Sequence, residues 1–256
     1  MRVRSLWPFV LLCSVWRPVV CACYDSQQRA RSTRNAIATR EANIPMPQME
    51  AIDIPVNHGI LEGLLRLPDM ENVPTRVAVV CHPHPLGQGT MHNKVVFTIA
   101  KALNAADIPA LRFNFRGVGR STGRYDEGRG EADDVRAALD WMATRYPTVP
   151  LLVAGFSFGA WVGLRVASTD PRVTHLIGAG IPIGLLDVSA VLDCTKPKLI
   201  VQSKIDEYAP LPALESWYDQ LTEPKTLALI DAPDHFFSGK LEEVASAVTL
   251  WARQNH

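Results

Sequence analysis

The segment GFSFG, residues 155–159, constrains the fold of this chain more than any other feature of the sequence. The apolar run 151–154 before it is typical of a buried strand, and the apolar segment 160–167 after it is typical of a helix. Together they predict a sharp turn from a strand into a helix, with Ser157 at its tip. Gly155 and Gly159 leave room for a strained backbone that would project the serine hydroxyl into a cleft.

Eight segments of the chain have the pattern of strands. The first two alternate apolar and polar residues around the turn Asn57-His58-Gly59, which is a hairpin signal. The other six are short, nearly continuous apolar runs, as expected for strands that are buried on both faces of a parallel sheet. The eight segments are 51–56, 59–67, 76–81, 110–115, 151–154, 175–180, 198–202 and 226–230.

Segments with a helical period lie between most of the later strands. Asn93 is a candidate N-cap for the first of them. The helices are predicted at 94–105, 131–146, 157–168, 211–221 and 241–254. An antiparallel opening followed by strand–helix repeats predicts an α/β domain over 49–256, with a mostly parallel eight-stranded sheet and helices on both faces.

Ser157 requires a base before it can act as a nucleophile, and two later loops supply candidates for a base and an acid. Asp206 follows the strand at 198–202, and His235 follows the strand at 226–230. The order serine, acid, histidine at the ends of successive strands is the one expected after such a turn. Asp187 is the rival acid, but it precedes the strand at 198–202 by many residues.

Backbone N–H groups near Ser157 could stabilise negative charge that develops on a substrate oxygen. The amide of Phe158 is one candidate, because it opens the helix after the serine. The loop after the strand at 76–81 supplies the second, and because Pro83 and Pro85 have no N–H, His84 is favoured with Leu86 as the fallback. A histidine pair at 82 and 84 without a nearby carboxylate or cysteine is weak evidence for metal, so no metal site is predicted.

Four blocks of the sequence carry a family resemblance: CHPHPLGQGTMHNKVV, LRFNFRGVGRSTGRYDEGRGEADDVRAALDW, GFSFGA and DHFF. They resemble the small bacterial dienelactone-hydrolase-like branch of the α/β-hydrolase superfamily, over about residues 51–253. The resemblance implies the α/β-hydrolase fold and a triad of Ser157, Asp206 and His235. It also implies that 116–121 is a loop shared by many relatives. Gln88 departs from the family pattern, which often has glycine there.

Polar residues in the matching blocks have a structural and a functional interpretation. Asn114, Arg116, Asp126 and Glu131 could fix loops beneath the site through hydrogen bonds and salt bridges, or they could contact substrate. The structural interpretation is favoured.

The insertion between the strands at 175–180 and 198–202 is only seventeen residues long, which predicts a minimal cap and an open cleft. The predicted walls of this cleft are apolar side chains: Met91, Phe156, Phe158, Ile181, Ile183 and Phe236. Such a cleft would accept a small or extended substrate without strong enclosure.

The chain has 26 basic and 26 acidic side chains, so its charge gives no reason to expect nucleic acid as a partner. Residues 1–48 are predicted to be a disordered or targeting extension, or to precede the true start at Met46 or Met49. The apolar run 6–16 resembles a signal-peptide core, yet its eleven residues are too few to span a bilayer. A cytoplasmic location is favoured over export or lipoprotein anchoring.

The leading hypothesis is a serine hydrolase that cleaves carboxylic esters or related acyl bonds of small molecules without a cofactor. Ser157 would attack, His235 would carry the proton and Asp206 would orient the histidine. Cleavage of peptide or amide bonds on the same scaffold is one alternative, and a non-catalytic ligand-binding protein is another. The sequence leaves the natural substrate and the oligomeric state open.

Overall fold

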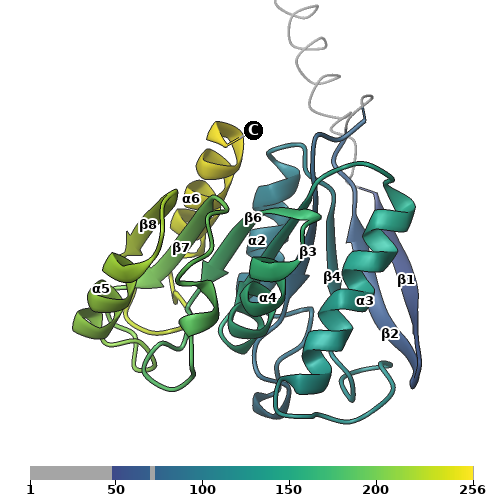
Figure 1. Cartoon of the computed structure of the whole chain (residues 1–256), viewed down its shortest axis with the longest axis horizontal. Coiled ribbons are helices and arrows are strands. Elements are labelled where there is room, and N and C mark those ends of the chain that lie inside the picture. Colours follow the sequence, from purple (N-terminus) through teal and green to yellow (C-terminus); the bar gives the residue numbers. More distant parts are fainter. Residues whose placement is uncertain (1–47, 70–72, 256) are drawn as a thin grey trace, which may run out of the picture. The chain divides into compact units, whose positions relative to one another are not determined.

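A computed structural model describes residues 48–69 and 73–255 of the chain. The predictions for the amino-terminal extension lie outside the described residues, except at Gln48. An eight-stranded sheet runs through this part of the chain in the order β1-β2-β4-β3-β5-β6-β7-β8 (Figure 1). The strands are β1 (Met49–Val56), β2 (Gly59–Arg66), β3 (Val77–Cys81), β4 (Ala110–Phe113), β5 (Leu151–Phe156), β6 (Val173–Ala179), β7 (Lys198–Ser203) and β8 (Lys225–Ile230).

The strand directions confirm the predicted mixed sheet. β1 pairs antiparallel with β2, and β2 pairs antiparallel with β4. Every other neighbouring pair is parallel. The carboxyl ends of β3, β5, β7 and β8 therefore meet at one edge of the sheet, and the loops that follow them can converge there.

Helices cover both faces of the sheet (Figure 1). The cluster of buried residues on one face includes side chains of α3 (Arg129–Arg145), α4 (Phe158–Thr169) and α5 (Leu211–Gln220). The cluster on the other face includes side chains of α2 (Lys94–Asn104) and α6 (Leu241–Gln254). Two short 3-10 turns, η1 (Pro85–Gly87) and η2 (Ser189–Val191), lie in loops.

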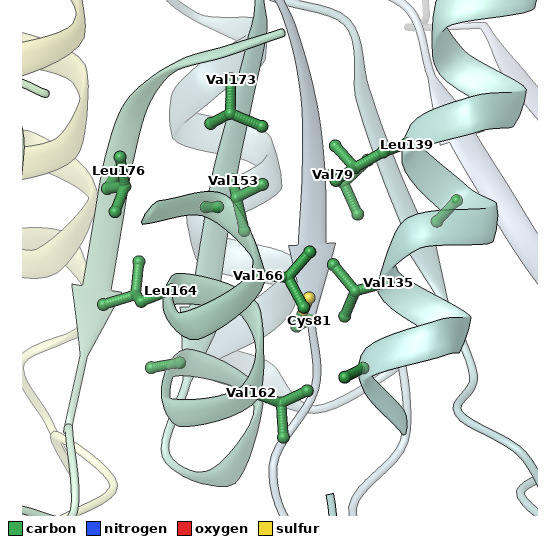
Figure 2. Close-up of a cluster of buried hydrophobic side chains, with 14 of the residues drawn as sticks. Val79, Cys81, Val135, Leu139, Val153, Val162, Leu164, Val166, Val173 and Leu176 are labelled. Atoms are coloured by element: carbon green, nitrogen blue, oxygen red, sulfur yellow. The ribbon is translucent and has the colours of Figure 1, made fainter. Parts of the chain in front are cut away.

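The core on the α3 and α4 face explains why the strands read as unbroken apolar runs. Figure 2 shows Val79 and Val153 of the sheet in one cluster with Val166 of α4 and Val135 of α3. All four side chains are at most 3% exposed. The opposite faces of the same strands bury Val80 and other apolar side chains against α2 and α6. Because both faces are covered, alternation is lost.

Element boundaries differ from the predicted ones by a few residues, and two of these differences shape the site. β5 extends to Phe156, so the strand continues to the residue before Ser157. α3 begins at Arg129, two residues earlier than predicted, because the Glu131 carboxylate accepts hydrogen bonds from the N–H groups of Asp126 and Gly128.

The segment between β6 and β7 contains only the turn η2, so the predicted minimal cap is confirmed. Within residues 48–69 and 73–255, no helix combines the length and the apolar character that a bilayer span requires.

Candidate active site

Ser157 lies at the turn between β5 and α4 with a backbone that few residues other than glycine adopt. Its φ is 56° and its ψ is −124°. The Ser157 N–H donates to the carbonyl of Ala179 at 2.9 Å, and its own carbonyl accepts from the Trp161 N–H at 3.1 Å. These two bonds hold the strained residue between β6 and α4, so its position is determined by regular structure on both sides.

The two glycines of the turn are required by close backbone contacts. A Cβ atom on Gly155 would lie 2.5 Å from the carbonyl oxygen of Gly159. A Cβ atom on Gly159 would lie 2.3 Å from the carbonyl oxygen of His82. The predicted need for glycine at both positions is confirmed, and the second contact brings the loop after β3 against the start of α4.

Ser157, His235 and Asp206 are brought together in one hydrogen-bonded chain. His235 Nε2 lies 2.9 Å from Ser157 Oγ, and His235 Nδ1 lies 2.9 Å from Asp206 Oδ2. His235 is 1% exposed and Asp206 is 6% exposed. Since a carboxylate can only accept, Nδ1–H donates to Asp206 and leaves Nε2 free to accept the serine proton. The geometry is that of a nucleophile, a base and a group that orients the base.

Asp206 is itself held by two donors, one of which the sequence analysis missed. Gln202 Nε2 donates to Asp206 Oδ2 at 2.6 Å, and the Tyr208 N–H donates to Oδ1 at 2.8 Å. Gln202 Oε1 accepts from the Ile181 N–H at 3.0 Å, so both ends of its amide are used. Gln202 is fully buried at the end of β7. A polar residue directly after the apolar run 199–201 of a buried strand was the signal that could have identified it.

Aromatic side chains surround the His235 ring. Phe156 stacks on it with centroids 5.0 Å apart, and Tyr208 packs edge-on at 4.7 Å. Phe236 lies on another side at 5.3 Å. With its two ring nitrogens hydrogen-bonded and its faces packed, the imidazole is fixed in the orientation that points Nε2 at Ser157.

Of the six predicted wall residues, Phe236 is the exposed one, at 51%. Ile183 is half-buried, and the other four are at most 3% exposed: Met91, Phe156, Phe158 and Ile181. The four buried side chains therefore do not line an open cleft in this structure. Phe156 supports His235 from behind, and the backbone of Met91 bridges Asn114 and Arg112.

In the described part of the chain, the two backbone N–H groups that the sequence analysis favoured as donors to a substrate oxygen are both without a partner. Within the described residues, the amides of Phe158 and His84 have no hydrogen-bond acceptor, while the Leu86 N–H donates to His84 Nδ1 at 3.2 Å. The His84 and Phe158 rings are 4.9 Å apart, which places the two residues side by side. The N-terminus of α4 adds the positive end of a helix dipole at Phe158.

The two histidines of the loop after β3, His82 and His84, have structural contacts. His82 Nδ1–H donates to the Pro83 carbonyl at 2.6 Å, and Nε2 accepts from the Phe115 N–H at 3.0 Å. Burial lowers the pKa of His82 to about 4, so the ring is neutral at pH 7. Tyr125 Oη lies 3.1 Å from His84 Nε2. No group of three metal-ligating side chains occurs in the part of the chain that the structure describes.

Asp187, the rival acid, is occupied elsewhere. Its carboxylate accepts from the Ser189 N–H at 2.9 Å, and its carbonyl accepts from Trp161 Nε1. Hydrogen bonding by Ser189 lowers the pKa of Asp187. The structure thus places Asp206, and not Asp187, on His235.

The other polar residues of the matching blocks form the contacts that the structural interpretation predicts. Arg116 forms a salt bridge with buried Asp134 at 2.7 Å. Asn114 Oδ1 accepts from the Met91 N–H, and the Asp126 carboxylate accepts from the Gly130 N–H. Together with the Glu131 cap, these bonds fix the loops that lead into α2 and α3.

Comparison with known proteins agrees with this geometry. A family model described as serine aminopeptidase, S33, matches residues 78–185. A solved α/β serine hydrolase without lid from Xanthomonas campestris is 37% identical, with a TM-score of 0.74, over 82% of this chain and 96% of that one. A solved α/β serine hydrolase homologue from Coxiella burnetii is 36% identical, with a TM-score of 0.73, over 81% and 99%.

An uncharacterized protein of Rickettsia prowazekii is 35% identical over 199 residues, which are 74% of this chain and 83% of that protein. Identity at this level over nearly the full length of the relatives establishes a family. The chain belongs to the α/β serine hydrolase family and is a hydrolase.

Proposed function

We propose that Ser157, His235 and Asp206 form a catalytic triad that hydrolyses carboxylic esters or related acyl bonds of small molecules. The observation that supports this most is the continuous chain of hydrogen bonds from Ser157 Oγ through His235 to Asp206, with both links at 2.9 Å. The strained backbone of Ser157 gives independent support, because strain of this kind persists where a side chain must be aimed.

In the first half of the reaction, His235 Nε2 accepts the proton of Ser157 as Oγ attacks the carbonyl carbon. The negative charge on the carbonyl oxygen is stabilised by the N–H groups of Phe158 and His84. Asp206 stabilises the imidazolium that forms. His235 then passes the proton to the leaving oxygen, the carbon–oxygen bond breaks, and an alcohol leaves an acyl-serine behind.

In the second half, a water molecule replaces the alcohol and His235 accepts one of its protons. The hydroxide attacks the acyl carbon, the bond to Ser157 Oγ breaks, and the proton returns to the serine. One ester and one water thus yield one carboxylic acid and one alcohol. The short segment between β6 and β7 leaves this site accessible to water and to extended substrates.

A fluorophosphonate probe and a short p-nitrophenyl ester test the proposal. The wild-type protein should be labelled at Ser157, and Ser157→Ala should lose labelling and about 10⁴-fold or more in kcat. Ser168→Ala is the matched control, because Ser168 lies in the same helix and donates only to the Arg165 carbonyl. A wild-type protein that neither labels nor turns over any ester would support a non-catalytic binding role.

Peptide-bond cleavage is a second candidate, favoured by the serine aminopeptidase description of the matching family model. Aminoacyl and acyl-peptide chromogens assayed beside the esters separate the two. Higher kcat/KM on the peptides than on the esters would replace the esterase proposal with the peptidase one, on the same three residues.

A further inference from the structure

Helices α2 and α6 lie on the face of the sheet opposite α3, α4 and α5 (Figure 1). A groove runs between these two helices. Its volume is about 760 Å³, within the range of small-molecule sites. The two helices touch through small residues. At this contact Thr249 Oγ1 donates to the Ala102 carbonyl at 3.1 Å. Two large apolar side chains, Phe97 and Leu250, are 41% and 59% exposed beside it. The groove is therefore mostly apolar.

The groove continues toward the proposed catalytic site as far as Phe236. A second hollow of about 520 Å³ shares His92, Lys94 and Leu241 with it and extends to Gln88 and Phe236. Gln88 ends the turn η1 in the loop after β3, and the Phe236 ring lies 5.3 Å from that of His235. Both helices also start at the edge of the sheet where the site lies. A path thus leads from Phe236 along the 11 residues of α2, about 16 Å.

The charges along this path are predominantly positive. Lys94 lies at the near end of the groove, and Lys101 and Arg253 line it further on. Arg253 Nη2 donates to the Ala105 carbonyl, which places the guanidinium at the far end of α2. Glu242 is the one acidic side chain among the lining residues. An anion near the far end would meet two cations.

Two further cations lie behind Phe97. The guanidinium carbons of Arg112 and Arg66 are 5.3 and 5.8 Å from the centre of its ring. Arg112 is 2% exposed, donates from Nη1 to the Met91 carbonyl, and has no hydrogen-bond partner at Nε. Within the described residues, neither arginine has a carboxylate at ion-pair distance. The α2 wall of the groove therefore carries positive charge that the described residues do not neutralise.

We propose that the groove binds the leaving part of the substrate, an apolar chain that ends in an anionic group. The proposal rests on the proposed hydrolysis at Ser157. In that reaction His235 gives its proton to the leaving oxygen, and Phe236, the next residue, lines the hollow that opens into the groove. The leaving alcohol thus faces this path, its chain can cover Phe97 and Leu250, and its charge can approach Lys101 and Arg253.

Three acetyl esters test the inference: those of ω-hydroxydodecanoate, of dodecanediol monophosphate and of uncharged dodecanol, with acetate release as the readout. For the wild-type protein at low salt, kcat/KM should be about tenfold higher for the charged tails than for the uncharged tail. The carboxylate and phosphate arms show which anion is preferred. Because each variant is scored by its own ratio of charged to uncharged ester, changes in overall activity cancel.

Lys101→Glu should reduce that ratio to about twofold or less, because it reverses the charge at the far end of the groove. Arg136→Glu is the matched control, since Arg136 is an exposed arginine on α3 at the opposite face of the sheet. The control should keep the wild-type ratio. A wild-type ratio of charged to uncharged kcat/KM near one would overturn the groove as a binding site. So would an equal decrease of that ratio in Lys101→Glu and Arg136→Glu.

Calorimetric titration of dodecanoate into Ser157→Ala separates this inference from the proposed function. Binding that weakens severalfold when Lys101→Glu is added supports the groove even if no ester is turned over. Absence of binding, together with equal hydrolysis of charged and uncharged esters, rejects the groove while leaving hydrolysis at Ser157 intact.

Discussion

The loops after β3 and β8 each contain a buried histidine, and the two histidines differ in what their ring nitrogens contact. His235, after β8, meets a serine hydroxyl at Nε2 and a carboxylate at Nδ1. His82, after β3, meets the N–H of Phe115 at Nε2 and the carbonyl of Pro83 at Nδ1. Both rings are at most 1% exposed. Burial and two hydrogen bonds are thus common to both, and only the partners differ.

The partners decide what each histidine can do. The backbone groups bonded to His82 exchange no protons with it, so the ring works as a fixed brace between the loop after β3 and the segment that follows β4. The partners of His235 are a hydroxyl that can lose its proton and a carboxylate that can stabilise the charged ring. A buried histidine thus becomes a candidate base through the chemistry of its neighbours, and variants of the two histidines should differ accordingly.

The largest expected effect separates the two histidines by activity. His235→Gln should lower kcat on a short p-nitrophenyl ester by about 10⁴-fold, since no base then accepts the serine proton. His82→Gln should retain fluorophosphonate labelling and turnover within about tenfold, because only a brace is altered. Steady-state kinetics and probe labelling of both variants check this. Comparable losses of kcat in both would show that His82 takes part in the chemistry.

A smaller effect is expected at Gln202, which links Asp206, the partner of His235, to the backbone of Ile181. Gln202→Leu should lower kcat by about tenfold to a hundredfold with little change in KM, because the carboxylate loses a donor that positions it. The buried Ile181 N–H also loses its acceptor, so the free energy of unfolding should fall by about 1–3 kcal/mol.

Gln202→Met distinguishes positioning from packing. Methionine fills a volume close to that of glutamine, but it neither donates to Asp206 nor accepts from the Ile181 N–H. Both kcat and stability should therefore stay below the wild-type values. If kcat returns to the wild-type value while urea unfolding still shows reduced stability, Gln202 acts on catalysis through packing alone.

The same residues show which parts of the candidate site can be predicted from the sequence. Ser157, Asp206 and His235 were predicted to lie together because the carboxyl ends of parallel strands share one edge, and their order along the chain follows from that topology. Gln202 was missed because its role depends on a backbone N–H from another loop, at residue 181. Phe156 was assigned to a pocket wall because apolar residues beside a nucleophile suggest one, yet β5 extends far enough to turn its ring behind His235.

The smallest expected effect is a pH dependence of stability on the His82 side. Burial lowers the pKa of His82 from 6.5 to about 4 in the folded chain. Between these values the unfolded chain binds a proton that the folded chain does not, so stability is complete above pH 6.5 and falls as the pH drops toward 4. The full shift corresponds to about 3 kcal/mol.

His175 has the same sign, since burial, followed by the charge of Arg76, lowers its pKa to about 4. The glutamine in His82→Gln cannot titrate, so only His175 still contributes in that variant. Between pH 6.5 and pH 4, the part of the decrease in unfolding free energy that the two rings cause should therefore be about half as large as in the wild-type protein. Urea unfolding at several pH values measures this. Identical pH profiles of unfolding free energy for His82→Gln and the wild-type protein would mean that the ring titrates alike in the folded and unfolded chains. Burial would then not lower the pKa of His82, contrary to this prediction.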